Sequence, residues 1–249
     1  MTRRTILAYH GVARCGPDDD PHRLFVSPEA FAAQMAALAR RRRVVSLDEV
    51  LDDGVSDGRP LVAITFDDAY ESVLTEAAPV LRAHGFPATV FAPTAWLGRR
   101  SAWMQEMRAP VDILDPDGLR ALEREGVQVE SHGHGHIDLS AADEGDIRRD
   151  LEQSISALTE ILGRAPRFLA YPFRTGSPVA ADVAAELGFA DAFSIDLPDE
   201  GRFRRGRVQV TPLDGPALFR LKTGGLYLRL RFAPPLAAAY RVSKIVLRR

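Results

Sequence analysis

Two adjacent carboxylates, Asp67 and Asp68, follow directly after an apolar stretch at 61–66. That stretch is rich in strand-forming residues, and successive side chains of a strand point to opposite faces. The two acids therefore stand where a strand of a barrel or an α/β sheet opens into its loop, which is where such proteins carry their chemistry. We expect Asp67 and Asp68 to divide one hydrolytic reaction, with one carboxylate handling a proton and the other a metal ion.

Three of the six histidines, His132, His134 and His136, lie within five residues, directly after a predicted strand at 127–130. In a helical turn, His132 and His136 would lie on the same side, as metal ligands require. In an extended segment, all three would face the same way instead. Gly133 and Gly135 would let the backbone turn tightly. The cluster favours a metal site over three structural or solvated histidines.

Other metal-binding patterns fit this sequence less well. The His-x-His motifs of amidohydrolase barrels and of metallo-β-lactamase-like hydrolases need further histidines downstream, and none follows His136. Two histidines with one carboxylate, Asp67 or Asp68, would leave coordination positions open for water and substrate. Glu130 and Asp138 flank the histidines, and we interpret both as capping or surface acids.

Apolar runs and helical periods alternate along the chain. Strands are predicted at 5–9, 44–45, 61–66, 88–92, 127–130, 168–171, 192–194 and 208–210. Helices are predicted at 28–43, 48–51, 70–84, 115–125, 143–162 and 179–187, the first from its Ser27-Pro28 start. This alternation predicts parallel βα units in a barrel or a doubly wound sheet, and one domain.

Three segments resemble the motifs of the NodB-homology polysaccharide deacetylases, carbohydrate esterase family 4. The segment 65–70 resembles the first motif, Thr-Phe-Asp-Asp-Gly, with Ala69 in place of the glycine. The segment 131–136 resembles the second, His-Ser/Thr-x-x-His-Pro, with departures at Gly133 and Ile137. The segment 168–173 resembles the third, Tyr-Pro-Tyr/Phe-Gly, with Arg174 where glycine is usual.

This resemblance implies a distorted (β/α) barrel with about seven parallel strands. It also implies a metal-dependent hydrolase that removes an N-acetyl group from an amino sugar in a polysaccharide, an oligosaccharide or a lipid-linked saccharide. Asp67 matches the family's general base. Asp68, His132 and His136 match the ligands of one divalent metal ion, which is usually Zn²⁺ and sometimes another divalent ion.

The general acid of most relatives is a histidine in a late motif, which this chain lacks because no histidine follows His136. A branch resembling the poly-N-acetylglucosamine deacetylases takes this acid from an N-terminal Tyr-His, and Tyr9-His10 stands at the matching place. The resemblance thus implies His10 as the general acid, with a histidine that only packs at a strand end as the alternative. We expect His22 and His84 to be surface residues.

Substrate-binding residues are predicted near the third motif, at Tyr171, Phe173 and Arg174. Tyr171 and Phe173, with Trp96 and Trp103, would suit stacking on a sugar ring, although aromatic residues at such positions are as often part of the core. A cation at Arg174 would suit an anionic sugar, a carboxylate or a diphosphate-linked substrate. A solvent-facing arginine is the alternative.

Composition limits the partners. The chain has 249 residues, of which 46% are hydrophobic, and a formal charge of −2, which favours neither a nucleic-acid binder nor an unusually acidic protein. Its single cysteine, Cys15, excludes an intrachain disulfide. We find no apolar run long enough for a signal peptide or a bilayer span, so we expect a cytoplasmic protein.

We expect residues 1–249 to form a single domain with a basic C-terminal extension at about 215–249. This extension has eight basic residues and no Asp or Glu. A basic amphipathic helix at 236–249 would suit peripheral contact with an anionic membrane, or packing on the barrel.

Two other functions remain open on the sequence. A deacylase or imidase acting on a non-sugar amide would keep the fold and the metal site. A non-catalytic carbohydrate-binding relative would explain why Ala69, Ile137 and Arg174 depart from the family motifs.

Overall fold

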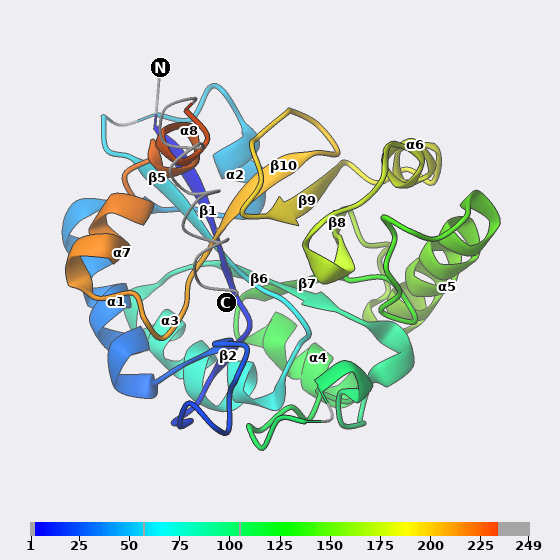
Figure 1. Ribbon diagram of the computed structural model, residues 1–249, viewed down its shortest axis with the longest axis horizontal. Helices are drawn as coiled ribbons and strands as arrows, with labels where there is room; N and C mark the ends of the chain where they lie inside the picture. The colour runs from blue at the N-terminus through cyan, green and yellow to red at the C-terminus, as the bar shows by residue number, and fades with distance from the viewer. Residues whose placement is uncertain (1–2, 57, 105, 234–249) are drawn as a thin grey trace, which may run out of the picture.

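A computed structural model describes residues 3–56, 58–104 and 106–233. At its centre, seven parallel strands close into a barrel in the order β1-β10-β9-β8-β7-β6-β5, with β5 pairing back onto β1 (Figure 1). These strands are β1 (Arg4–Tyr9), β5 (Leu61–Phe66), β6 (Ala88–Ala92), β7 (Val127–Ser131), β8 (Phe168–Ala170), β9 (Asp191–Ile195) and β10 (Arg205–Gln209). The expected (β/α) barrel with about seven parallel strands is confirmed.

The pairing of β1 with β5 closes the barrel and aligns the residues that follow the two strands. Their register runs from Arg4 opposite Leu61 to Tyr9 opposite Phe66, and the N–H of Asp67 donates to the carbonyl of Tyr9 at 3.0 Å. His10 and Asp67 therefore leave neighbouring strands at the same height. Three short strands complete the set: β4 (Arg43–Val44) pairs with the start of β5, and β2 (Gly11–Val12) pairs with β3 (Phe25–Val26).

Helices cover the outside of the barrel (Figure 1). They are α1 (Pro28–Arg41), α2 (Leu47–Leu51), α3 (Ala78–His84), α4 (Pro116–Arg124), α5 (Glu144–Leu162), α6 (Pro178–Glu186), α7 (Pro216–Lys222) and α8 (Tyr227–Arg231). Side chains of Ser27, Asp115, Asp143 and Ser177 accept hydrogen bonds from the first turns of α1, α4, α5 and α6. These caps explain why the predicted helix starts agree closely with the structure.

The predicted helix at 70–84 is divided. A π-turn, η1 (Val73–Ala77), leads into α3. Pro79 lacks an N–H for the helical ladder, and a wider turn before it accommodates that loss. Shorter 3₁₀ turns occupy the loops: η2 (Thr94–Trp96), η3 (Ala102–Met104) and η4 (Pro172–Arg174).

Because successive side chains of a strand point to opposite faces, the buried residues of the barrel strands fall into separate hydrophobic clusters. In β5, Val62, Ile64 and Phe66 belong to the main hydrophobic cluster with α1 and α3, whereas Leu61 and Ala63 belong to a second cluster with residues of β6, β8 and β9. All six residues of β5 are buried, as expected for a parallel strand covered on both faces.

The basic stretch from residue 215 begins as two helices on the barrel, α7 and α8. Lys222 is buried and donates to the Gln209 carbonyl at 2.7 Å and to Asp214 Oδ2 at 2.6 Å, so this cation holds α7 to the end of β10. The predicted basic helix at 236–249 lies outside the described residues. Within the described ranges, no helix combines the length and apolarity needed to cross a bilayer.

Candidate active site

A cleft of about 320 Å³ lies at the carboxyl ends of the barrel strands. Its lining brings together residues that are far apart in the sequence: His10, Asp67, Asp68, His132, His136, Tyr171, Phe173 and Arg174. Larger hollows of about 560 and 580 Å³ lie elsewhere on the described surface and hold none of these residues. The chemistry of its lining, not its size, distinguishes this cleft.

The turn after β5 separates the two aspartates. Asp68 and Ala69 adopt φ angles of 69° and 52°, in the left-handed region that side chains other than glycine rarely occupy. Ala69 is fully buried, and its carbonyl accepts a hydrogen bond from the Leu114 N–H at 3.0 Å. This tight turn explains why the family motif has a glycine at position 69.

Asp68, His132 and His136 form a cluster whose ligand atoms all lie within 4.8 Å of one another. Asp68 Oδ1 lies 3.5 Å from His132 Nε2 and 3.3 Å from His136 Nε2. Ligands about 2.0–2.2 Å from a tetrahedral Zn²⁺ lie about 3.3–3.6 Å apart, so the two spacings between Asp68 and the histidines fit a metal ion. Burial raises the pKa of Asp68, but hydrogen bonds from both histidines outweigh it and hold the pKa well below its ordinary value. The carboxylate is therefore charged and ready to bind a cation.

The orientation of His132 also suits a metal ligand. Its Nδ1 lies 2.8 Å from the carbonyl oxygen of Ala170, so Nδ1 carries the proton and donates it to that carbonyl. When the ring is neutral, Nε2 is therefore the nitrogen left to bind a cation beside Asp68. Metal-bound histidines are commonly fixed through their second nitrogen in this way.

The histidine loop is neither a helical turn nor an extended strand. Asp150 of α5 accepts hydrogen bonds from the N–H groups of His134 (2.9 Å) and Gly135 (2.7 Å). Gly133 has φ 74°, and a Cβ there would lie 2.6 Å from Asp150 Oδ2, so only glycine fits. The side chain of His134 turns to Thr94, with Nδ1 at 2.8 Å from Oγ1, and is absent from the cluster.

Aromatic side chains hold the ring of His136. Trp103 stacks on it with centroids 3.7 Å apart and an interplanar angle of 11°, and Phe173 meets its edge at 4.8 Å. The indole N–H of Trp96 donates to the Gly135 carbonyl at 3.1 Å. Both tryptophans therefore support the histidine loop. Trp103 also lines the cleft, so its stacking on a sugar ring stays a prediction.

Arg207 of β10 binds Asp67, an interaction that we did not predict. Its Nη1 and Nη2 donate to the two carboxylate oxygens at 2.7 and 2.8 Å, and Nη1 also donates to Thr65 Oγ1 at 2.9 Å. The Arg207 and Asp67 side chains are 0% and 2% exposed. Burial raises the pKa of Asp67, but the Arg207 charge, with help from His132 and His10, holds it below its ordinary value. Asp67 is therefore an ionised carboxylate in a fixed orientation beside the cluster.

His10 lies in the same cleft, as the register of β1 and β5 requires. Its Nδ1 is buried and has no hydrogen-bond partner among the described residues. Burial lowers the pKa of His10, and the nearby carboxylates of Asp68 and Asp67 raise it, with a net lowering. His22 and His84 are exposed, as expected, although His22 also lines the outer cleft and pairs with Glu106 at 2.6 Å.

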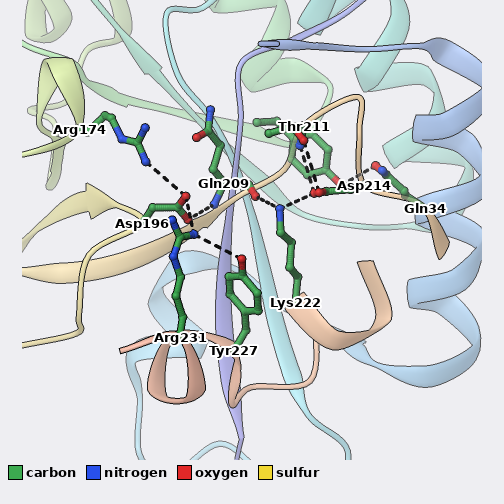
Figure 2. Close-up of polar contacts among 10 residues, drawn as sticks. Gln34, Arg174, Asp196, Gln209, Thr211, Asp214, Lys222, Tyr227 and Arg231 are labelled. Carbon is green, nitrogen blue, oxygen red and sulfur yellow. Dashed lines mark hydrogen bonds and ion pairs between the residues drawn. The ribbon is translucent and has the colours of Figure 1, made fainter. Parts of the chain in front are cut away.

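The turn after β8 supplies the other wall. Tyr171 and Phe173 both line the cleft. Tyr171 is buried, and its hydroxyl donates a hydrogen bond to the Phe203 carbonyl at 2.9 Å, whereas Phe173 is half exposed. Arg174 Nη2 lies 3.3 Å from Asp196 Oδ2. Figure 2 draws this contact as a dashed line. The structure thus places all three predicted substrate-binding residues at the cleft; their roles stay predictions.

The two acids beside the histidines behave differently. Asp138 accepts from the Ser140 N–H at 2.9 Å and is exposed, which fits our interpretation of a capping acid. Glu130 was interpreted wrongly, because its side chain is 0% exposed. It accepts from Arg164 at 3.0 Å and from the Phe168 N–H at 2.8 Å, and so joins β7 to the start of β8.

Sequence reasoning missed Arg207 and Asp150. The last strand was predicted at 208–210, whereas β10 spans Arg205–Gln209. The strand begins with Arg205 and Arg207, and these charged residues did not fit the apolar run by which the other strands were predicted. For Asp150 a signal was available. It lies on the same face of α5 as Ile147, Leu151 and Leu158, and a carboxylate on a buried helical face needs partners.

Comparisons with known proteins agree with this geometry. The family described as polysaccharide deacetylase matches residues 54–192, more than half of the chain. The poly-beta-1,6-N-acetyl-D-glucosamine N-deacetylase of Staphylococcus aureus (strain MRSA252) is 27% identical in an alignment of 144 residues that covers 54% of this chain and 48% of that protein. The first curated relatives are matched over 39 to 52% of their own lengths, so the chain spans about half of them or less.

Solved structures show the same fold. The Streptococcus pyogenes deacetylase PplD, in complex with acetate, aligns with a TM-score of 0.75 at 21% identity, covering 88% of this chain and 97% of that one. IcaB from Ammonifex degensii aligns with a TM-score of 0.74 at 22% identity, covering 92% and 98%. The match of the family over more than half of the chain, together with this barrel, establishes that the protein belongs to the polysaccharide deacetylase family.

Proposed function

We propose that this protein is a metal-dependent N-deacetylase that acts on an amino sugar in a polysaccharide, an oligosaccharide or a lipid-linked saccharide. The observation that carries the proposal is one cleft in which the Asp68, His132 and His136 cluster lies beside the buried Asp67–Arg207 pair. A hydrolase of this kind needs a metal site and a separate carboxylate base. The family and the name of the staphylococcal relative support the choice of substrate.

Asp68, His132 and His136 would hold one divalent ion, and we propose Zn²⁺ because the set of two imidazoles and one carboxylate suits it. When bound, the ion supplies Lewis acidity toward the acetamide carbonyl and lowers the pKa of water toward about 7. The protein's contribution is to fix the three ligands before the ion binds, through the contacts of His132 with Ala170 and of His136 with Trp103.

Asp67 accepts a proton from the attacking water while the water oxygen forms a bond to the acetamide carbon. Arg207 keeps Asp67 ionised and fixes the direction of its oxygens. A backbone N–H near Phe173 donates to the carbonyl oxygen as negative charge develops there. His10 then donates a proton to the nitrogen as the C–N bond breaks, which releases acetate and a free amine. General acid catalysis of this kind is worth about 10²–10⁴-fold.

Because burial lowers the pKa of His10 below its ordinary value of 6.5, its protonated fraction falls as pH rises through the range below 6.5. We therefore expect kcat/KM to decrease across that range and expect His10→Gln to remove the decrease together with most of kcat. A His10→Gln enzyme with the native pH profile would contradict the role of His10 as the acid.

Acetate release tests the proposal directly. The protein, loaded in turn with Zn²⁺, Co²⁺ and Ni²⁺, is incubated with β-1,4 and β-1,6 oligomers of N-acetylglucosamine, and acetate and free amine are measured in equal amounts. N-acetylated amino acids and a cyclic imide serve as non-sugar amides. Release from the sugars that a chelator abolishes supports the proposal. Release from the non-sugar amides alone indicates a different deacylase or imidase, and binding of the oligomers without turnover indicates a non-catalytic relative.

We also propose contact with an anionic membrane surface through the C-terminal part of the chain. Five exposed leucines lie within residues 213–230 (Leu213, Leu218, Leu221, Leu226 and Leu230), and Arg220 and Arg229 lie among them. Exposed apolar and cationic side chains in one segment suit such a surface. Co-sedimentation with phosphatidylglycerol vesicles tests the contact. Leu218→Asp/Leu221→Asp should reduce binding, and equal binding by the native chain and this variant would contradict it.

A further inference from the structure

Arg174 occupies an unusual backbone position at the wall of the cleft. It has φ 85°, and Phe173 before it has φ 53°, so two consecutive residues with side chains hold left-handed conformations. Such conformations are strained for residues with a side chain and persist where the surrounding structure imposes them. The relatives' third motif has glycine at this position. This chain instead carries a large cation there, in the turn that directly follows β8.

The charge of Arg174 is only partly balanced within the protein. Its Nη2 lies 3.3 Å from Asp196 Oδ2, and Arg231 of α8 approaches the same oxygen more closely, at 2.8 Å. Figure 2 shows both guanidinium groups converging on Asp196, whose Oδ1 also accepts from the Gln209 N–H at 3.2 Å. Arg174 thus shares its carboxylate partner with a second cation and makes the longer of the two contacts.

No other residue of the cleft lining can neutralise Arg174. Among the described residues that line the cleft, it is the one arginine or lysine, and the lining acids are Asp67 and Asp68. Asp67 is bound by Arg207, and Asp68 faces the two histidines of the cluster. The Arg174 side chain is 51% exposed, so it can reach a bound molecule. A guanidinium group presents paired N–H donors that match a carboxylate or a phosphate.

We infer that the cleft takes an amino sugar that carries an anionic group, a carboxylate or a phosphate, close to its N-acetyl group, and that Arg174 binds this group. The inference rests on the proposed deacetylase function and names the substrate class within it. The arginine fixes the orientation of the sugar, so its contribution lies mainly in substrate binding and hence in KM.

Matched substrates test the inference on the full-length, metal-loaded protein. Initial rates of acetate release are compared for N-acetylglucosamine, its 1-phosphate, its 6-phosphate and N-acetylmuramic acid, whose lactyl group carries a carboxylate. We expect kcat/KM for at least one anionic sugar to exceed that for the neutral sugar by about tenfold or more, as a charge-assisted hydrogen bond predicts. Preference for a phosphate identifies phosphorylated or diphosphate-linked substrates, and preference for the carboxylate identifies acidic sugars.

Two substitutions of Arg174 separate the effect of its charge from that of its backbone conformation, because both replacements must adopt the same positive φ. Arg174→Lys should keep most of the preference for the anionic sugar, whereas Arg174→Gln should reduce it to about threefold or less, chiefly through KM. Arg148→Gln is the matched control, because Arg148 is a partly exposed arginine of α5 that pairs with Glu186 at 2.6 Å outside the cleft. It should leave the preference unchanged. Thermal melting of each variant reports whether it is folded.

The outcomes separate the inference from the function on which it rests. Acetate release from neutral and anionic sugars with equal kcat/KM, or a preference that survives Arg174→Gln, overturns the anionic subsite and leaves the deacetylase proposal standing. Failure to release acetate from any sugar by a metal-loaded, folded protein overturns the deacetylase proposal itself. A preference that declines with added NaCl supports a partly exposed charge interaction.

Discussion

The buried pair of Asp67 and Arg207 provides the sharpest test of the site's electrostatics. Both side chains are almost fully removed from water and share two hydrogen bonds of 2.7 and 2.8 Å. Arg207→Met keeps much of the apolar stem of the side chain. It removes the guanidinium group, whose carbon lies 5.1 Å from the Phe91 ring centre, and leaves Asp67 buried without its cation. Breaking a buried pair in this way costs about 3–5 kcal/mol. At about 2–4 °C per kcal/mol for a chain of this size, the melting temperature should fall by about 6–20 °C.

The loss should depend on pH. In the native protein the pKa of Asp67 lies below its ordinary value of 3.8, so its contribution to stability is present above that value and is lost as pH falls through the folded pKa. Without Arg207, burial raises the pKa of Asp67, and protonation relieves the unpaired charge. The stability difference between the native protein and Arg207→Met should therefore shrink as pH falls from about 7 to about 5. The acidic limb of kcat/KM should also move to higher pH.

The measurement is thermal and urea unfolding with a chelator present, so that lost metal binding does not contribute. Arg205→Met is the control on the same strand. Arg205 is 29% exposed, and its partner Asp191, 6% exposed, keeps hydrogen bonds from the N–H groups of Ala192 and Phe203, so this loss should cost less than that of Arg207. Asp67→Asn/Arg207→Met should recover part of the stability that Arg207→Met loses. An Arg207→Met protein with native melting and a native pH profile would refute the pairing argument.

Three further predictions concern the histidine loop, the turn after β5 and Cys15. Asp150→Ala should weaken metal binding by about 10–100-fold in a titration with Zn²⁺, because it frees the histidine loop; an unchanged affinity would show that the loop holds its shape without Asp150. Ala69→Gly should stabilise the protein by about 1 kcal/mol in urea unfolding, because φ is 52° there, and a destabilised variant would contradict the strain argument. Burial raises the pKa of the Cys15 thiol to about 11, so Cys15 should react with iodoacetamide about 100-fold more slowly at pH 8 than an ordinary thiol. A normal rate would show that its surroundings do not suppress the thiolate.

Local signals in the sequence were sufficient for most of the barrel. Serine and aspartate caps such as Ser27 and Asp143, with a proline after Ser27, marked helix starts that the structure keeps. A site with two of the histidines and either Asp67 or Asp68 was also predictable, because the carboxyl ends of parallel strands meet at one edge of a barrel. The choice of Asp68, His132 and His136 came from the family resemblance. The position of His10 in the cleft follows from the same rule and from the pairing of β1 with β5.

The contacts that position these groups were not predictable in the same way. Arg207 binds a residue 140 positions away, and its strand begins with charged residues that conceal a buried segment. Trp103 lies in an irregular loop without periodicity, so nothing in the sequence indicated that it would stack on His136. Long-range pairing and loop packing depend on the completed fold, whereas caps and apolar runs act locally.

The central claim is that the two adjacent aspartates have different roles, Asp68 as a metal ligand and Asp67 as the base. The most direct test measures bound Zn²⁺ and acetate release side by side for Asp67→Asn and Asp68→Asn. We predict that Asp67→Asn retains about one metal ion per chain and loses turnover by about 10²-fold or more, while Asp68→Asn loses the metal and turnover together. An Asp67→Asn protein that turns over at near-native rates, or an Asp68→Asn protein that binds Zn²⁺ as tightly as the native chain, would contradict this division of roles.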